Sequence, residues 1–170
     1  MRLAPIAALG LLFAGAAASR EVAPVPGILP TGQGKAVDRE IAAARSATAG
    51  FRRVEAAIAA GYRATSVCVA HPDLGMMGLH YKNPALRDAT VDPRHPEILL
   101  YLPLPGGKVR LVGAEYVVPL ALWTGSEPPR LFGRQMHRDD NLGIWDLHVW
   151  YWASNRAGIF ADWNPDLRCP

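Results

Sequence analysis

Two histidines and one glutamate stand in segments whose other residues are mostly apolar: His80, Glu115 and His148. Two imidazoles and a carboxylate form a ligand set that iron, copper or zinc ions use in proteins, with positions left open for water or a substrate. The three residues are far apart in the sequence, and no HxH or HExxH spacing joins them. A divalent-metal site therefore requires a fold that brings three separate segments together. The alternative is that these side chains only hydrogen-bond within the core.

Glu115 is expected to point inward. Residues 108–118 have the composition of a strand, and successive side chains of a strand point to opposite faces of a sheet. The more apolar face of this segment consists of Val109, Leu111, Gly113, Glu115 and Val117. A carboxylate on that face must be paired, hydrogen-bonded, metal-bound or protonated, because burying it alone costs free energy.

His148 lies in a second predicted strand, residues 145–152. Alternation places it on the same face as Asp146, Trp150 and Trp152. Asp146 is therefore the residue expected to orient the His148 ring, because a carboxylate beside an imidazole fixes which ring nitrogen carries the proton.

His80 lies in a third predicted strand, residues 76–82, and shares a face with Met76 and Gly78, which leave room around its ring. His71 precedes a proline in a predicted loop, from which it can supply a fourth ligand.

Aromatic residues are concentrated near the C-terminus. Trp150, Trp152 and Trp163 are expected to form an aromatic surface that stacks on a small molecule or a saccharide, although the same rings also serve to fill a core. No phosphate-binding glycine loop and no Gly-x-Ser-x-Gly elbow is present.

The first residues have the features of an export signal. Residues 1–18 begin with Met-Arg, continue with an apolar run and end in Ala-Ala-Ala, which predicts a signal peptide and a secreted or periplasmic protein. Residues 19–37 contain several prolines and glycines and predict a flexible linker, and residues 38–170 predict a single globular domain. No later stretch is long enough to span a membrane.

Charge and cysteine content agree with this interpretation. The chain has 18 Lys plus Arg and 15 Asp plus Glu, a mild excess that gives no support for nucleic-acid binding. The two cysteines, Cys68 and Cys169, are expected to form a disulfide in an oxidising compartment, with two free thiols as the alternative.

The predicted elements indicate an α+β fold. Asp38 is a suitable N-cap for an amphipathic helix whose apolar stripe is Ala47, Phe51, Val54 and Ile58 and which ends at Gly61. Strands follow, and residues 98–104 and 108–118 flank Pro-Gly-Gly as a β-hairpin. We expect the helix to pack on a mostly antiparallel sheet, with a partly closed barrel or a cupin-like sandwich among the arrangements that fit.

Four motifs resemble those of a group of uncharacterised exported bacterial proteins. They are Met-Gly-x-His-Tyr-x-Asn-Pro at residues 77–84, Glu115-Tyr116, Leu-His-x-Trp at residues 147–150 and Trp-Asn-Pro at residues 163–165, close to Cys169. The resemblance implies no particular activity, but it includes the same three polar residues that the strand pattern selects.

Two function classes follow. The first is an exported metal-binding domain that can act at an open metal position. The second is a non-catalytic binding or structural module, in which the histidines and the glutamate stabilise the sheet and the aromatic residues fill the core or bind a ligand.

Overall fold

The computed structural model describes residues 34–65 and 67–170. Helices come first, and a sheet with short helical turns follows. The elements are α1 (Lys35–Thr48), η1 (Ala49–Arg52), α2 (Val54–Ala59), β1 (Arg63–Ala64), β2 (Val69–His71), β3 (Gly75–Lys82), η2 (Pro84–Leu86), β4 (Ile98–Pro103), η3 (Pro105–Gly107), β5 (Val109–Pro119), β6 (Arg130–Leu131), β7 (Arg134–Gln135), β8 (His137–Asp139) and β9 (Ile144–Val149).

The predicted N-terminal helix exists but is divided. Its first part, α1, ends at Thr48, whose Oγ1 donates to the Ala44 carbonyl, and the extended backbone of Arg53 separates η1 from α2. The predicted stripe is therefore wrong at Ala47 and Ile58, which are exposed, because the buried side of α1 consists of Ile41, Ala44 and Thr48 and that of α2 of Ala57. The spacing predicts the helix but not the break at Arg53.

The helix also begins earlier than predicted. It starts at Lys35, and the Asp38 amide donates to the Gly34 carbonyl, so Asp38 lies in the first turn instead of capping it. The predicted linker, residues 19–37, is therefore too long at its C-terminal end. Its first part and the predicted signal peptide, residues 1–18, lie outside the described residues.

The strands of the sheet differ in length, and every pairing between them is antiparallel. Their order is β1-β3-β4-β5-β9-β8, and β2 also pairs with β3. This confirms the α+β class and the mostly antiparallel sheet. The path of strands is open, so a partly closed barrel or a cupin-like sandwich is not confirmed. The β4–β5 hairpin forms around Pro105–Gly107, as the sequence predicts.

A β-bulge corrects one detail of the predicted strand faces. The register of β4 against β5 shifts between Leu100 and Tyr101, and alternation is interrupted there. Val109 and Leu111 consequently pack in a cluster with Tyr101, whereas Val112 and Val117 pack in a different one. Simple alternation predicted that Val109 and Leu111 share the face of Glu115. The bulge places them on the other face.

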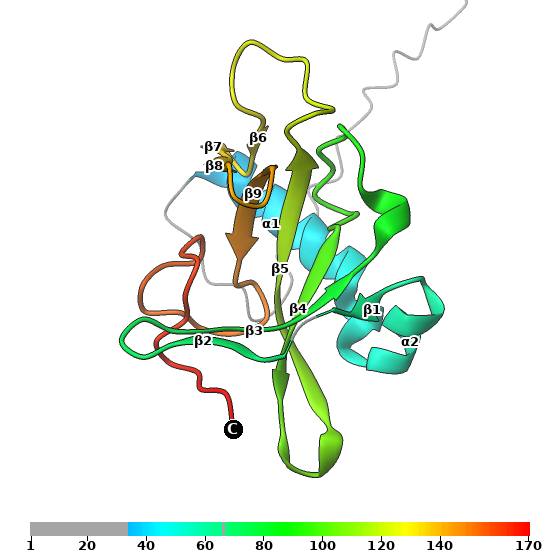
Figure 1. Cartoon of the computed structure of the whole chain (residues 1–170), viewed down its shortest axis with the longest axis vertical. Helices are drawn as coiled ribbons and strands as arrows, with labels where there is room; N and C mark the ends of the chain where they lie inside the picture. Colours follow the sequence, from blue (N-terminus) through cyan, green and yellow to red (C-terminus); the bar gives the residue numbers. More distant parts are fainter. Residues whose placement is uncertain (1–33, 66) are drawn as a thin grey trace, which may run out of the picture.

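Different segments of the chain pack against the two faces of the sheet. α1 lies across one face (Figure 1), where Ile41 and Ala44 pack against Ala114, Tyr116 and Val118. The opposite face carries a separate apolar cluster: Met76, Ile98, Leu100, Leu102, Val112, Val117, Ile144 and Trp150.

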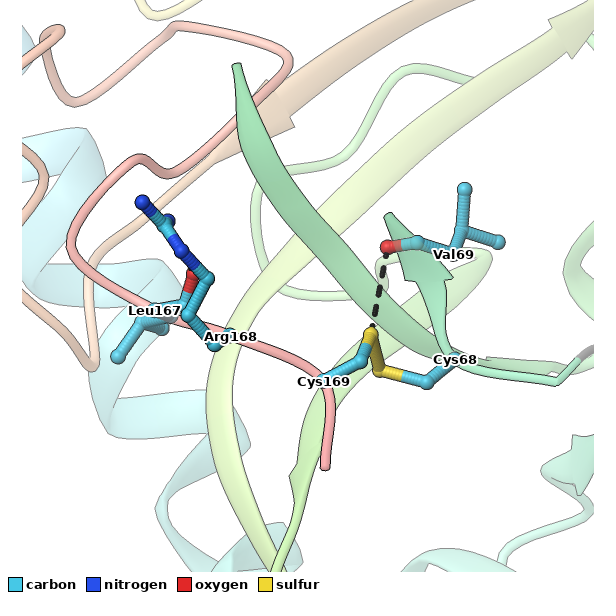
Figure 2. Close-up of a disulfide and its surroundings, with 5 residues drawn as sticks. All are labelled: Cys68, Val69, Leu167, Arg168 and Cys169. Carbon is cyan, nitrogen blue, oxygen red and sulfur yellow. Dashed lines mark hydrogen bonds between the residues drawn. A yellow bond between two sulfur atoms is a disulfide. The ribbon is translucent and has the colours of Figure 1, made fainter. Parts of the chain in front are cut away.

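The C-terminal segment covers part of this second face. It runs beside β2 and β3 (Figure 1), where Met76 and Asn164 exchange two backbone hydrogen bonds. Gly75 makes this approach possible, because a Cβ there would lie 2.1 Å from the Asn164 carbonyl oxygen. The predicted disulfide between Cys68 and Cys169 is present and fixes the end of the segment to the start of β2 (Figure 2).

Within the described part of the chain, no helix has the length and apolar character needed to cross a membrane.

Candidate metal centre

Three strands bring His80, Glu115 and His148 together. His148 on β9 is paired directly with Glu115 on β5, so both side chains leave the sheet side by side on the same face. His80 comes from β3, on the far side of β4, where it is paired with Leu100. In this way residues separated by about 70 positions in the sequence meet on the second face of the sheet.

The spacing of the three side chains suits a metal ion. Glu115 Oε2 lies 3.4 Å from His80 Nε2 and 3.8 Å from His148 Nε2, and one ligand atom from each residue lies within 4.8 Å of the others. Two ligand atoms bound to a tetrahedral zinc ion at 2.0–2.1 Å lie roughly 3.3 Å apart. Small side-chain movements therefore convert this arrangement into a coordination shell with at least one open position.

The cluster is buried and incompletely satisfied. The side chains of His80, Glu115 and His148 are 10%, 6% and 3% exposed. Neither ring nitrogen of His148 makes a hydrogen bond, although buried polar atoms are nearly always paired. An ion bound to Nε2 would supply the partner that this ring lacks.

Close approach of the backbone allows this packing. At Gly113, a Cβ would lie 2.5 Å from the Val149 carbonyl oxygen, so a larger residue would push β5 away from the chain that carries His148. Gly113 is also the β5 residue opposite Leu100, in the row of the sheet that contains His80. The glycine thus permits the close packing of strands on which the cluster depends.

The electrostatics of the cluster differ from one residue to the next. Burial raises the pKa of Glu115, and the positive charge of His148 acts against this rise. Burial, the neighbouring His148 and then Lys82 lower the pKa of His80 to about 4, so its ring is neutral at physiological pH, as a metal ligand must be.

His148 shows the opposite behaviour. Burial acts to lower its pKa, but the carboxylates of Glu115, Asp162 and Asp146 together outweigh burial and raise it. Three carboxylates around one imidazole thus make an environment that favours positive charge. A proton on His148 or a divalent cation at its Nε2 can provide that charge.

Two aspartates face the other nitrogen of His148. Its Nδ1 lies 3.9 Å from Asp146 Oδ2 and 3.6 Å from Asp162 Oδ1. Asp146 is the residue predicted to orient the ring, and the structure places it nearby, but its Oδ1 lies closer to His137 Nδ1, at 3.2 Å. Burial raises the pKa of Asp146, whereas the neighbouring His148 lowers that of Asp162.

A cleft of about 480 Å³ opens beside these aspartates. Asp146 and Leu147 of β9 line it from one side, and Arg134, Gln135, His137 and residues 157–162 line it from others. This volume is within the range of small-molecule sites. The cleft adjoins the Nδ1 side of His148, whereas the three candidate metal ligands meet at its Nε2 side.

His71 does not join the cluster. It is exposed on β2, and its Nδ1 accepts hydrogen bonds from the amides of Asp73 and Leu74, with its ring 5.6 Å from that of Trp163. This histidine closes the turn between β2 and β3 and is not among the three clustered ligands.

The three tryptophans predicted to form one aromatic surface lie in different places. Trp150 is buried in the second-face cluster and its Nε1 donates to the Ala161 carbonyl. Trp152, beyond the end of β9, packs on the opposite side, where its Nε1 donates to Thr48 Oγ1 and Arg45 lies over its ring. The prediction that Trp150 and Trp152 share a face is therefore wrong. The strand ends at Val149, and the alternation of side chains ends there too.

The ring of Trp163 lies next to that of His71. Binding of a saccharide or another small molecule at Trp150, Trp152 or Trp163 stays a prediction, and buried Trp150 offers little surface for it.

Sequence reasoning missed two residues of this site. Asp162 lies in the C-terminal segment, which shows no periodicity, immediately before the Trp-Asn-Pro motif. His137 begins the edge strand β8, where it is paired with Asp146. Asp162 becomes a neighbour of His148 through tertiary structure, whereas His137 reaches Asp146 through the pairing of two consecutive strands.

Comparison with known proteins gives no match: neither a family model, nor a curated protein, nor a solved structure is similar to this chain. The case for function therefore depends on the geometry of the cluster.

Proposed function

We propose that this protein is an exported domain that binds one divalent transition-metal ion through His80, Glu115 and His148. The ion is iron, copper or zinc, which share a preference for imidazole nitrogen combined with carboxylate oxygen. Three protein ligands leave one or more positions open, which is the pattern of metal sites that bind water or a substrate.

The unsatisfied ring of His148 is the observation that carries the proposal. A buried imidazole with no hydrogen bond at either nitrogen destabilises the fold, and its Nε2 points to the carboxylate that also meets His80. A metal ion at this point would satisfy the ring, neutralise buried Glu115 and use the neutral ring of His80. One ion would thus satisfy the His148 ring and balance the charge of buried Glu115.

Competition between protons and metal follows from the same electrostatics. The carboxylates around His148 raise its pKa, so protons compete with an ion for this ring more strongly than for an ordinary histidine. Metal binding is therefore expected to release a proton and to weaken as the pH falls.

The disulfide supports the export part of the proposal. Cysteines that close a loop of 101 residues are typical of proteins that fold in oxidising compartments, such as the periplasm or the extracellular space. We infer the same location from the predicted signal peptide and from the resemblance to exported bacterial proteins.

The test is metal analysis of the untagged protein produced in an oxidising compartment. The wild type is expected to contain close to one equivalent of iron, copper or zinc, or to take it up after chelation. His80→Ala, Glu115→Gln and His148→Ala are expected to lose it. His95→Ala is the matched control, because His95 is exposed and pairs only locally, with Asp92 at 2.8 Å. Wild-type protein that neither contains nor takes up metal would overturn the proposal.

A structural role for the same residues is the second candidate, and the His80–Glu115 contact of 3.4 Å favours it. A polar contact of this kind can hold β3 and β5 together across β4 without any metal. In that case the three variants melt at lower temperature, and adding metal raises the melting temperature of neither the wild type nor the variants.

A further inference from the structure

We infer that Asp162, on the C-terminal segment, is the residue that positions His148 for metal binding. The inference rests on the proposed metal site and concerns the nitrogen of His148 that faces away from it. A histidine that binds metal through one nitrogen usually donates the other N–H to a carboxylate or a carbonyl, which fixes the ring and raises its basicity. The question is which group has that role here.

Asp162 is the nearer of the two carboxylates. Its Oδ1 lies 3.6 Å from His148 Nδ1, whereas Asp146 Oδ2 lies 3.9 Å away. Both distances exceed that of a hydrogen bond. The Asp162 side chain is 54% exposed and can close the remaining gap by a small rotation.

Asp146 already has another partner. Its Oδ1 lies 3.2 Å from Nδ1 of His137, so a movement toward His148 would weaken that contact. Asp146 also belongs to the same strand as His148, two residues before it, where the backbone determines its direction. Asp162 approaches from a different segment and has no such constraint.

The backbone around Asp162 is firmly held. The Trp150 amide donates to the Ile159 carbonyl, and Trp150 Nε1 donates to the Ala161 carbonyl, so the same β9 extension that carries His148 anchors the residues before Asp162. After Asp162, buried Asn164 exchanges two backbone hydrogen bonds with Met76. The disulfide then fixes Cys169 to Cys68. Asp162 is therefore presented to the His148 ring from a segment attached on both sides.

The test compares Asp162→Asn with Asp146→Asn in the full protein, with Asp166→Asn as control. Asp166 lies on the same segment but pairs with Arg156 at 2.8 Å, away from His148. Removing an orienting carboxylate typically weakens metal affinity by 10–100-fold, so Asp162→Asn is expected to raise the Kd for zinc by about that factor. Asp146→Asn is expected to raise it less, and Asp166→Asn by less than about twofold.

Two spectroscopic readouts separate positioning from a loss of stability. The cobalt-substituted Asp162→Asn protein is expected to show altered ligand-field absorption. In the zinc-loaded protein, ¹⁵N NMR is expected to show the Nδ1–H of His148 in a stronger hydrogen bond in the wild type than in the variant.

Two results would overturn the inference while leaving the metal site intact: an unchanged zinc Kd in Asp162→Asn, or a larger effect of Asp146→Asn. Failure of the wild type to bind zinc or cobalt at all would overturn the metal site and this inference together.

Discussion

The two faces of the sheet differ in the chemistry of the polar groups that they bury. On the face under α1 these are hydroxyl and indole groups: the hydroxyls of Tyr101 and Tyr116 donate to the Phe51 and Pro93 carbonyls, whereas Tyr151 Oη and Trp145 Nε1 have no hydrogen-bond partner. On the opposite face, His148 is buried with neither nitrogen hydrogen-bonded.

One strand, β5, contributes side chains to both faces. Ala114 and Tyr116 of β5 pack under α1, while Glu115 between them points to the histidines. The face under the helix packs against α1, and the face under the C-terminal segment carries the candidate ligand set. Changes to the two faces are therefore expected to separate stability from metal binding.

The largest effect is expected from removing the cross-link of the second face. Replacing both Cys68 and Cys169 by serine opens a loop of 101 residues, and loop entropy predicts a loss of about 4–5 kcal/mol of unfolding free energy. Urea denaturation measures this loss. Hydrogen exchange is expected to show earlier opening of the C-terminal segment than of the strands under α1. A loss below about 1 kcal/mol would contradict the loop-entropy estimate.

Two neighbouring leucines of β4 compare the faces directly. Leu99 and Leu100 are both fully buried, but Leu99 packs with the helix-side residues and Leu100 with the second-face cluster. Leu99→Ala and Leu100→Ala are each expected to cost about 2–5 kcal/mol.

Only Leu100→Ala is expected to weaken metal binding as well, because Leu100 is paired with His80 on the second face, whereas Leu99 packs on the helix side. Zinc titrations of both variants, under conditions where each is folded, provide the measurement. Equal zinc affinities would contradict a functional division between the faces.

Glu115→Gln separates the stability of the cluster from its chemistry. Metal at 100 times its Kd stabilises the wild type by about 2.7 kcal/mol, and this gain is expected to vanish in the variant. Without metal, the two proteins are expected to differ by only about 1 kcal/mol, because the glutamine removes a charge that burial disfavours. Thermal melts with and without zinc test both statements. A gain from zinc that survives in Glu115→Gln would place the metal elsewhere.

The pH dependence of stability is expected to depend on Glu97, a buried carboxylate outside the cluster. Its Oε2 accepts a hydrogen bond from the Val117 amide, and burial raises its pKa to about 8 from an ordinary 4.5. The folded state therefore binds more protons than the unfolded state between these pH values. Its stabilising contribution is complete below about pH 4.5 and declines as the pH rises toward 8, by at most about 1.4 kcal/mol per unit.

Glu97→Gln is expected to flatten this decline, with the largest gain over wild type above pH 8. Melting curves of both proteins from pH 5 to about pH 9 provide the comparison. Parallel curves across that range would mean that Glu97 is charged in the folded protein.

Local patterns predicted the parts of the fold that local physics determines. The β4–β5 hairpin follows from Pro-Gly-Gly between two apolar runs, and the inward direction of Glu115 follows from alternation near the centre of β5. The same rule failed at Val109 and Leu111, because a bulge depends on the partner strand as well as on the sequence of β5.

Tertiary contacts determined the rest. His80, Glu115 and His148 were predicted as one set from their residue types, but their meeting depends on the order β3-β4-β5-β9. Asp162 and His137 reach the site through a segment without periodicity and through an edge strand of three residues. Alternation also wrongly extended β9 to Trp152, because nothing in that aromatic run indicates where pairing with β5 ends.

The most direct test of the metal centre is a crystal structure of the zinc- or copper-loaded protein, with diffraction data collected at the absorption edge of the metal. If the ion binds as proposed, one anomalous peak is expected about 2.0–2.2 Å from the Nε2 atoms of His80 and His148 and from a carboxylate oxygen of Glu115. A peak only at other residues, or none in protein that had been saturated with metal, would contradict it.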